Sequence, residues 1–147
     1  MKKLNLNPKN IKAGDCVIRA IAYATEQSWD TVYKSLCELG FKMKRMPNDK
    51  KVFHKYLDNL GWIKHKQPME INYDNGYADK KKKYTVNELM QMIESEHRGL
   101  GVGKVIVSMP RHLTCIEPQD NWKYEIVDMW DCGNSKVGNY WTKEGGK

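Results

Sequence analysis

The segment Asn10-Ile11-Lys12-Ala13-Gly14-Asp15-Cys16-Val17-Ile18-Arg19-Ala20-Ile21-Ala22 turns from a polar loop into an apolar helix, with a cysteine at the turn. Asp15 is a good N-cap residue, so a helix is predicted from Cys16 to about Thr25. Its residues are almost all apolar, so this helix is expected to be buried on most sides. A thiol in the first turn meets unpaired N–H groups and the positive end of the helix dipole, which favour the thiolate. Most free cysteines are instead small core residues, and Cys16 alone would fit that role.

Length and composition predict one globular domain in a reducing compartment. The 147 residues suffice for a single domain with a hydrophobic core. The sequence has no run of about 18 apolar residues that could span a membrane, and Met1–Asn5 lacks the apolar centre of a signal peptide. We therefore expect a soluble, cytoplasmic protein. Thiols stay reduced there, so no disulfide is expected among Cys16, Cys37, Cys115 and Cys132.

Positive charge is concentrated in the middle third of the chain. Residues 42–83 contain twelve Lys and Arg against five Asp and Glu, a net charge of +7. Such a segment can make weak contact with nucleic acid or with an acidic protein partner, and Tyr73, Tyr77 and Tyr84 offer rings on which bases could stack. A lysine-rich stretch is more often simply a solvated surface, and both interpretations stay open.

Capping signals predict three further helices. Ser28 can cap a second helix, and Gly40 is predicted to end it. Asn48 can cap a third helix. Thr85 and Glu88 have the spacing of a capping box, which predicts the start of a fourth helix.

The other segments predict an insertion and a set of strands. Apolar residues in the segment 63–83 follow neither a helical nor a strand spacing, and the segment contains turn formers and a lysine run. A basic irregular insertion is therefore expected there. Short apolar runs after residue 103 predict strands, with a hairpin around the loop Pro118–Trp122. These strands cover residues 104–109, 112–117, 123–129 and 136–142. Because helices come first and strands last, we predict an α+β fold in a single domain of residues 1–147.

The predicted hairpin brings a histidine next to an acid. If Glu117 faces Lys123 across the loop, His112 lies directly opposite Asp128, with Cβ atoms roughly 4.5–5.5 Å apart on one face of the sheet. A carboxylate in that place can hold an imidazole ring. A slip of one residue would put the two side chains on opposite faces, and an ordinary strand histidine beside an acid is the alternative interpretation.

Four short motifs contain the cysteine, the histidine, the acid and the last predicted strand, in this order along the chain. They are Asp15-Cys16-Val17-Ile18-Arg19-Ala20, His112-Leu113-Thr114, Val127-Asp128-Met129-Trp130-Asp131 and Gly138-Asn139-Tyr140-Trp141. A cysteine opening a buried helix, a later histidine opening a strand and an acid on the next strand follow the order of a papain-like nucleophile. The sequence resembles the papain-like cysteine peptidase superfamily. It is most similar to small phage and bacterial members and to the double-glycine leader peptidases, over roughly residues 10–36 and 104–141.

The resemblance implies a papain-like α+β fold, with the nucleophile helix buried against a C-terminal antiparallel sheet. It implies a cysteine peptidase that cleaves a peptide or isopeptide bond through Cys16, His112 and Asp128, on a protein or peptide substrate, with no cofactor and no metal. Acyl transfer or deamidation by the same triad is a related outcome. A bacterial or phage-infected cell would be the setting. Asp131 is the alternative third member of the triad.

The resemblance also implies an oxyanion hole. The family places Gln six positions before the cysteine, and this chain has Asn10 there, with Asn7 as the alternative. An amide at this position would donate to the oxyanion together with the Cys16 N–H. Arg19, one turn after Cys16, is expected to pair with Asp15 or another buried acid in a structural role. Val17 stands where papain has an aromatic residue.

Three other interpretations compete with an active peptidase. A zinc site could use His112, Cys115, Asp131 and Cys132, although the sequence lacks a C-x-x-C pair. A basic module could bind nucleic acid or an acidic protein through residues 42–83. A catalytically inactive papain-like fold could serve as a binding scaffold.

Overall fold

The protein has the α+β architecture that the order of its segments predicted. A computed structural model describes residues 1–74, 77–96 and 102–143, with the backbone alone for residues 70–74 and 77–81. The helices are α1 (Cys16–Thr25), α2 (Trp29–Met43), α3 (Lys50–Asn59) and α4 (Val86–Glu96). The strands are β1 (Lys2–Lys3), β2 (Trp62–His65), β3 (Met69–Asp74), β4 (Tyr77–Lys83), β5 (Val105–Met109), β6 (His112–Pro118), β7 (Tyr124–Asp128) and β8 (Tyr140–Lys143). Among these described residues, no helix combines the length and apolar character needed to cross a membrane.

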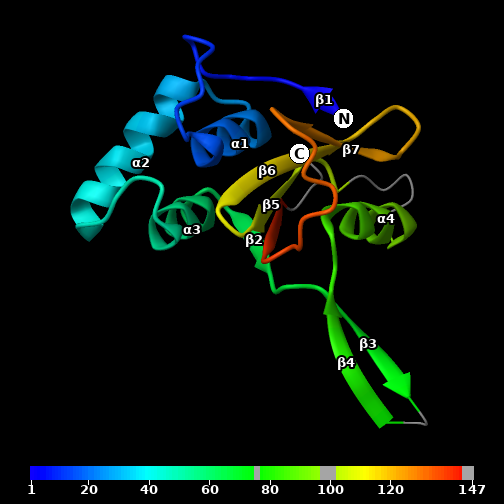
Figure 1. Ribbon diagram of the computed structural model, residues 1–147. Coiled ribbons are helices and arrows are strands. Elements are labelled where there is room, and N and C mark those ends of the chain that lie inside the picture. The colour runs from blue at the N-terminus through cyan, green and yellow to red at the C-terminus, as the bar shows by residue number, and fades with distance from the viewer. Residues whose placement is uncertain (75–76, 97–101, 144–147) are drawn as a thin grey trace.

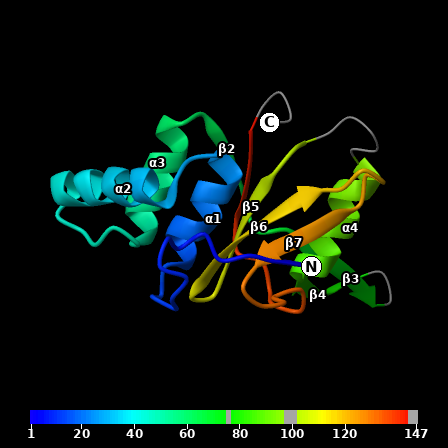
Figure 2. The ribbon, with the colours of Figure 1, turned by 90° about the horizontal axis from the view of Figure 1, so that it is seen from above.

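A six-stranded sheet forms the centre of the molecule, in the order β1-β7-β6-β5-β8-β2 (Figure 1). Neighbouring strands are antiparallel, except that the short β1 runs parallel to β7. Helices α1, α2 and α3 lie on one side of this sheet and α4 lies on the other (Figure 2). The sheet is therefore the middle layer between two groups of helices.

Successive strand residues divide between two apolar clusters, as the period of two requires. Ile106 and Leu113 pack with the buried side chains of α1, α2 and α3. Val105 and Ile116 pack with those of α4. Most of α1 is buried, as its composition predicted; its buried residues are Val17, Ile18, Ala20, Ile21, Ala22 and Ala24. This packing fixes the N-terminal end of α1 against the start of β6.

Helix α2 begins where it was predicted to begin and ends later. The Ser28 hydroxyl accepts a hydrogen bond from the Thr31 N–H at 3.1 Å. The helix continues through Gly40 to Met43, so the prediction that Gly40 ends it is wrong. A Cβ atom at residue 40 would lie 2.6 Å from the Arg45 carbonyl oxygen. Glycine is thus needed there because the chain leaving the helix passes close to it.

The starts of α3 and α4 follow local capping chemistry. Asp49, rather than the predicted Asn48, caps α3, and its carboxylate accepts a hydrogen bond from the Lys51 N–H at 2.8 Å. The capping box of α4 is confirmed. Glu88 accepts from the Thr85 N–H at 3.0 Å, and the Thr85 hydroxyl accepts from the Glu88 N–H at 3.2 Å.

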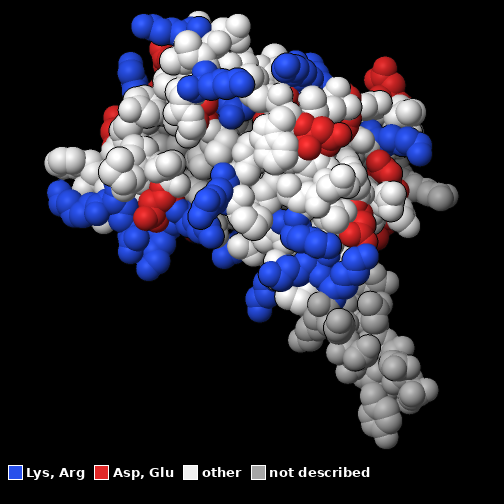
Figure 3. All heavy atoms as spheres, viewed as in Figure 1, with Lys and Arg blue, Asp and Glu red and all other residues white. Residues whose placement is uncertain are grey.

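Most of the described residues between 63 and 83 lie in strands, so the prediction that this segment is irregular is wrong for them. Strand β2 pairs with β8 at the edge of the main sheet, and β3 pairs with β4 in a separate two-stranded hairpin. The hairpin extends away from the body of the molecule (Figure 1). Lys and Arg side chains gather where it joins the body (Figure 3). Contact of residues 42–83 with nucleic acid or an acidic partner stays a prediction.

Replacing Gly40 by alanine is expected to destabilise the protein. In an open helix interior the change stabilises by up to about 1 kcal/mol, because alanine has the higher helix propensity. Here the added methyl group meets a backbone carbonyl at 2.6 Å, so we expect the free energy of unfolding to fall by about 1–3 kcal/mol. Urea unfolding measures this, with Ser35→Ala on the same helix as the control. A Gly40→Ala protein more stable than the wild type would contradict the close approach.

Candidate active site

Cys16 is the first residue of α1, as its position after Asp15 predicted. Asp15 occupies the N-cap position, but its side chain makes no capping hydrogen bond. The buried carboxylate instead accepts from Asn7 Nδ2 at 3.0 Å, from Arg19 Nε at 2.9 Å and from Trp29 Nε1 at 2.8 Å. The expected side-chain cap is therefore wrong, because three donors from other parts of the chain take the carboxylate. Asp15 does not compete for the first-turn N–H groups beside the Cys16 thiol.

Arg19 joins the two buried carboxylates of this region. Its Nε atom contacts Asp15 at 2.9 Å, and its Nη1 atom lies 3.4 Å from Asp128 Oδ1. The Arg19 side chain is 15% exposed and those of its two partners are 4% and 3% exposed, so water screens these ion pairs little. The structural role predicted for Arg19 is confirmed.

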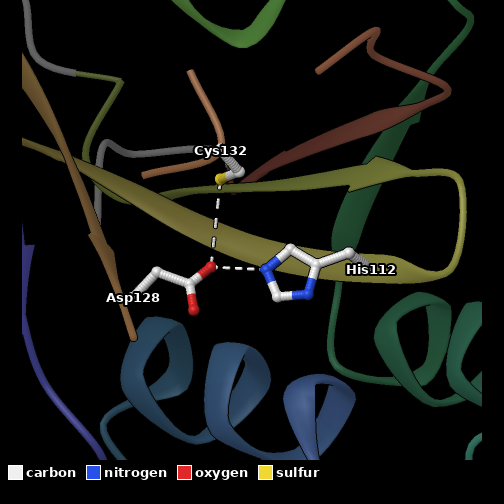
Figure 4. Close-up of side chains that lie close together, drawn as sticks. All are labelled: His112, Asp128 and Cys132. Carbon is white, nitrogen blue, oxygen red and sulfur yellow. Dashed lines mark hydrogen bonds and ion pairs between the residues drawn. The ribbon is translucent and has the colours of Figure 1, made fainter. Parts of the chain in front are cut away.

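Hydrogen bonds from three neighbouring residues hold the Asp128 carboxylate in one orientation. His112 Nε2 lies 2.6 Å from Oδ2, and the Thr114 hydroxyl donates to the same oxygen at 2.6 Å. The Met129 N–H donates to Oδ1 at 2.6 Å. Figure 4 shows that the edge of the imidazole ring points at the carboxylate and that the Cys132 thiol approaches Oδ2 from another side. The His112–Asp128 pair expected from the hairpin is therefore present.

The pairing of β6 with β7 differs by two residues from the predicted register. Glu117 pairs with Glu125 instead of the expected Lys123. Trp122 adopts a left-handed conformation (φ 66°) and helps to close a tighter loop than the predicted one. A shift of two keeps every side chain on its predicted face, whereas a shift of one would not. The histidine and the carboxylate thus share a face although they are not directly opposite.

His112 links the carboxylate to the thiol and changes the charge state of both partners. Burial by itself raises the pKa of Cys16, but the interaction with His112, a hydrogen bond with the Leu113 backbone and the charge of Arg19 together lower that pKa below the usual 9.0. Burial likewise lowers the pKa of His112, but hydrogen bonds with Asp128, Cys132 and Cys16 raise it to about 11. For Asp128, burial opposes ionisation, and the hydrogen bonds from His112 and Thr114 lower the pKa. These directions favour a thiolate–imidazolium pair beside an ionised carboxylate.

The two amides predicted for an oxyanion hole have different surroundings. Asn10 is exposed in the loop before α1, with a left-handed backbone (φ 53°), and its N–H donates to the Asn7 carbonyl at 2.8 Å. Asn7 is buried, and its Nδ2 donates to Asp15. Of the two, only Asn10 presents its side chain to solvent in front of α1.

The other residues predicted for the triad or for a zinc site have separate surroundings. Asp131 follows β7, and its carboxylate accepts a hydrogen bond from the Gly133 N–H at 2.9 Å. Cys115 is fully buried in the cluster between the sheet and α1. The structure therefore does not bring together the set of His112, Cys115, Asp131 and Cys132 that a zinc site was to use.

A different set has metal-ligand chemistry. The donor atoms of His112, Asp128 and Cys132 all lie within 4.8 Å of one another, and nitrogen, oxygen and sulfur donors suit zinc. The imidazole and the carboxylate, however, already contact each other directly at 2.6 Å. A metal ion would have to open that hydrogen bond and displace the proton on it.

Sequence reasoning missed two residues that contact the pair. Thr114 lies two residues after His112 and so shares its face of the strand, a signal that the period of two could have supplied. The ring of Trp130 lies 4.9 Å from the ring of His112, between centroids. Trp130 also lines an open groove of about 420 Å³, together with Ile11, Gly14 and Asp15. The groove is therefore lined by the residue that precedes Cys16 and by the ring that contacts His112.

Comparison of the chain with protein-family models, with curated proteins and with solved structures gave no match. The papain-like resemblance rests on the four sequence motifs and stays a prediction. A function is therefore inferred from the geometry of Cys16, His112 and Asp128.

Removing the Asp15 carboxylate is expected to destabilise the protein and to change its response to acid. Burial raises the pKa of Asp15, but the bonds from Asn7, Arg19 and Trp29 lower it below the ordinary 3.8. The ionised Asp15 carboxylate therefore stabilises the fold fully above its unfolded-state pKa of 3.8. This contribution is lost as the pH falls through the lowered pKa of the folded state. For Asp15→Asn we expect the free energy of unfolding at neutral pH to fall by about 2–3 kcal/mol.

Urea unfolding at neutral pH and at about pH 3 measures this effect. The difference in free energy of unfolding between the variant and the wild type should be smaller at the acidic pH. Asp49→Asn is the control, because Asn caps a helix as well as Asp does. If the difference for Asp15→Asn is the same at both pH values, the ionised carboxylate does not stabilise the fold as argued.

Proposed function

We propose that this protein is a thiol hydrolase of the papain-like kind, a cysteine peptidase with Cys16 as nucleophile, His112 as acid and base, and Asp128 as the residue that orients the imidazole. One observation supports this most strongly. His112 Nε2 contacts Asp128 Oδ2 at 2.6 Å, and the interaction of His112 with Cys16, which stands at the N-terminus of α1, lowers the pKa of that thiol. Activated thiols have this combination of a helix start and a charged imidazole.

In the first half of the proposed reaction the Cys16 thiolate attacks the carbonyl carbon of a peptide or isopeptide bond. The carbon–sulfur bond forms, and the carbonyl electron pair moves to oxygen. His112 then gives its proton to the leaving nitrogen as the carbon–nitrogen bond breaks and the carbonyl re-forms. Asp128 keeps the ring in place, because its Oδ2 atom holds Nε2, and Nδ1 would be the ring nitrogen that exchanges the proton with the thiol and the leaving group.

In the second half water clears the acyl-enzyme. Neutral His112 accepts a proton from water, the hydroxyl oxygen bonds to the acyl carbon, and the thiolate leaves. An amine in place of water would complete an acyl transfer by the same steps. Charge on the oxyanion would be met by the Cys16 N–H, for which the Asp15 carboxylate does not compete, and by the Asn10 amide from the loop.

The groove beside Trp130 supports a peptide as the substrate class. Its volume of about 420 Å³ suits a few residues of extended chain. Ile11 is 51% exposed and Trp130 is 47% exposed, and both offer apolar contact in the lining of the groove. A substrate held there lies next to the residue that precedes Cys16.

Alkylation by iodoacetamide tests whether Cys16 is activated. At pH 7 we expect Cys16 to react at least about tenfold faster than Cys37, because only the thiolate reacts and the pKa of Cys16 is lowered. In His112→Ala this advantage should disappear. Mass spectrometry of peptides after timed labelling gives both rates in one sample, so Cys37 is an internal control. Equal rates for the two cysteines in the wild type would refute an activated thiol.

Acylation by p-nitrophenyl acetate tests whether the thiol performs catalysis. We expect an acetyl group on Cys16 that water then removes, with turnover slowed about 10²–10⁴-fold in Asp128→Asn, because the imidazole loses its orientation. Asp131→Asn is the matched control and should turn over like the wild type. Release of p-nitrophenol gives the rates, and circular dichroism shows that each variant is folded. If Asp131→Asn is the impaired variant, the assignment of Asp128 is wrong.

A further inference from the structure

Helix α2 carries an exposed apolar seam that the proposed active site does not use. Tyr33 is 42% exposed and Phe41 is 74% exposed, and the half-buried Cys37 lies midway between them, one helical turn from each. A shallow hollow of about 380 Å³ adjoins Cys37 and Phe41. The buried side of α2, about 100° around the helix from the seam, packs into the core through Val32, Leu36 and Gly40. The seam is thus a second apolar face on a helix that already has one.

The residues of the seam are symmetric about Cys37. Aromatic residues stand four positions before it and four positions after it. An acid, Asp30, stands seven positions before it, and a base, Lys44, stands seven positions after it. At 100° per residue, Asp30, Tyr33 and Phe41 lie within about 40° of the helix face of Cys37. Lys44 is the left-handed C-cap residue that follows the helix. Lys44 Nζ lies 4.1 Å from the centre of the Phe41 ring, which puts this cation on the seam.

Such symmetry fits a second copy of the same helix running antiparallel. Across a two-fold axis at Cys37, a residue n positions before the axis meets the residue n positions after it on the other copy. Tyr33 then packs on Phe41 of the second copy, next to the hollow. Asp30 meets Lys44 of the second copy, so opposite charges face each other at both ends. In a parallel pair like charges would meet instead.

The surroundings leave this seam accessible to a second copy. Helix α2 lies at the outer edge of the molecule, on the side away from α4 and the β3–β4 hairpin (Figures 1 and 2). Tyr33 is already ordered by stacking on Trp29, with ring centroids 5.0 Å apart, so less side-chain entropy is lost on association. We propose that two copies of this chain associate through antiparallel α2 helices centred on Cys37.

Sedimentation equilibrium over a range of concentrations tests the association. We expect the mass to rise from monomer to dimer, and Phe41→Glu to raise the dissociation constant at least about tenfold, because a carboxylate would replace the central aromatic contact. Met46→Glu is the matched control, since Met46 is 70% exposed and follows α2 outside the seam. A wild type that stays monomeric up to about 1 mM overturns the proposal, as does a dimer that Phe41→Glu leaves unchanged.

Charge exchange tests the antiparallel arrangement. Asp30→Lys and Lys44→Asp should each weaken the dimer about threefold to tenfold, because like charges then face each other. The double variant should recover the wild-type constant, since each new acid meets a new base on the other copy. Failure of the double variant to recover overturns the antiparallel pairing. Cys16 alkylation in the same samples reports on the active site independently, because the seam does not include it.

Discussion

The buried carboxylate of Asp128 is the group on which the candidate site depends. It is 4% exposed, and an ionised carboxylate without partners at that depth would cost several kcal/mol. His112, Thr114 and the Met129 N–H supply those partners on one side, and Arg19 supplies a charge on the other. The carboxylate in turn determines where the imidazole can lie. An orientation needed for catalysis thus follows from a requirement of folding.

Arg19 extends this requirement to the cysteine. It lies on α1 one turn after Cys16, and it bridges Asp15 at the start of the helix and Asp128 at the end of β7. Two buried acids and two cations, Arg19 and charged His112, balance one another. A thiolate at Cys16 adds one negative charge, which the positive end of the α1 dipole partly offsets. The fold therefore already contains the charges that the ion pair needs.

Features set by neighbouring residues could be predicted from the sequence. The start of α1, the Ser28 cap and the Thr85–Glu88 box depend on contacts within a few positions, and the structure has all three. The direction in which the Asp15 side chain turns depends on Asn7 and Trp29 instead. These partners reach it only when the chain has folded, so local cap propensity predicted the wrong contact.

The pairing of His112 with Asp128 was predicted from a register that is wrong by two. It survived because side-chain direction in a strand has a period of two, and the true loop displaced the strands by an even number. The loop geometry depends on Trp122, an aromatic residue in the left-handed conformation, which sequence rules seldom expect. Strand β2 was missed for a related reason. Its partner β8 lies far along the chain, and no local pattern reveals that pairing.

Two cysteines near the same sheet have pKa values shifted in opposite directions, because their surroundings differ. Cys115 lies in strand β6 within the core, and burial raises its pKa far above the usual value, so it stays a thiol. Cys16 is only half-buried; desolvation raises its pKa too, but the interactions with His112, the Leu113 backbone and the Arg19 charge outweigh it and lower the pKa. The pKa of His112 is raised to about 11 and that of Cys16 is lowered, so both shifts favour the same thiolate–imidazolium pair. Burial keeps the Cys115 thiol neutral, whereas at Cys16 the surrounding charges and hydrogen bonds act in a partly buried site where they are stronger than in water.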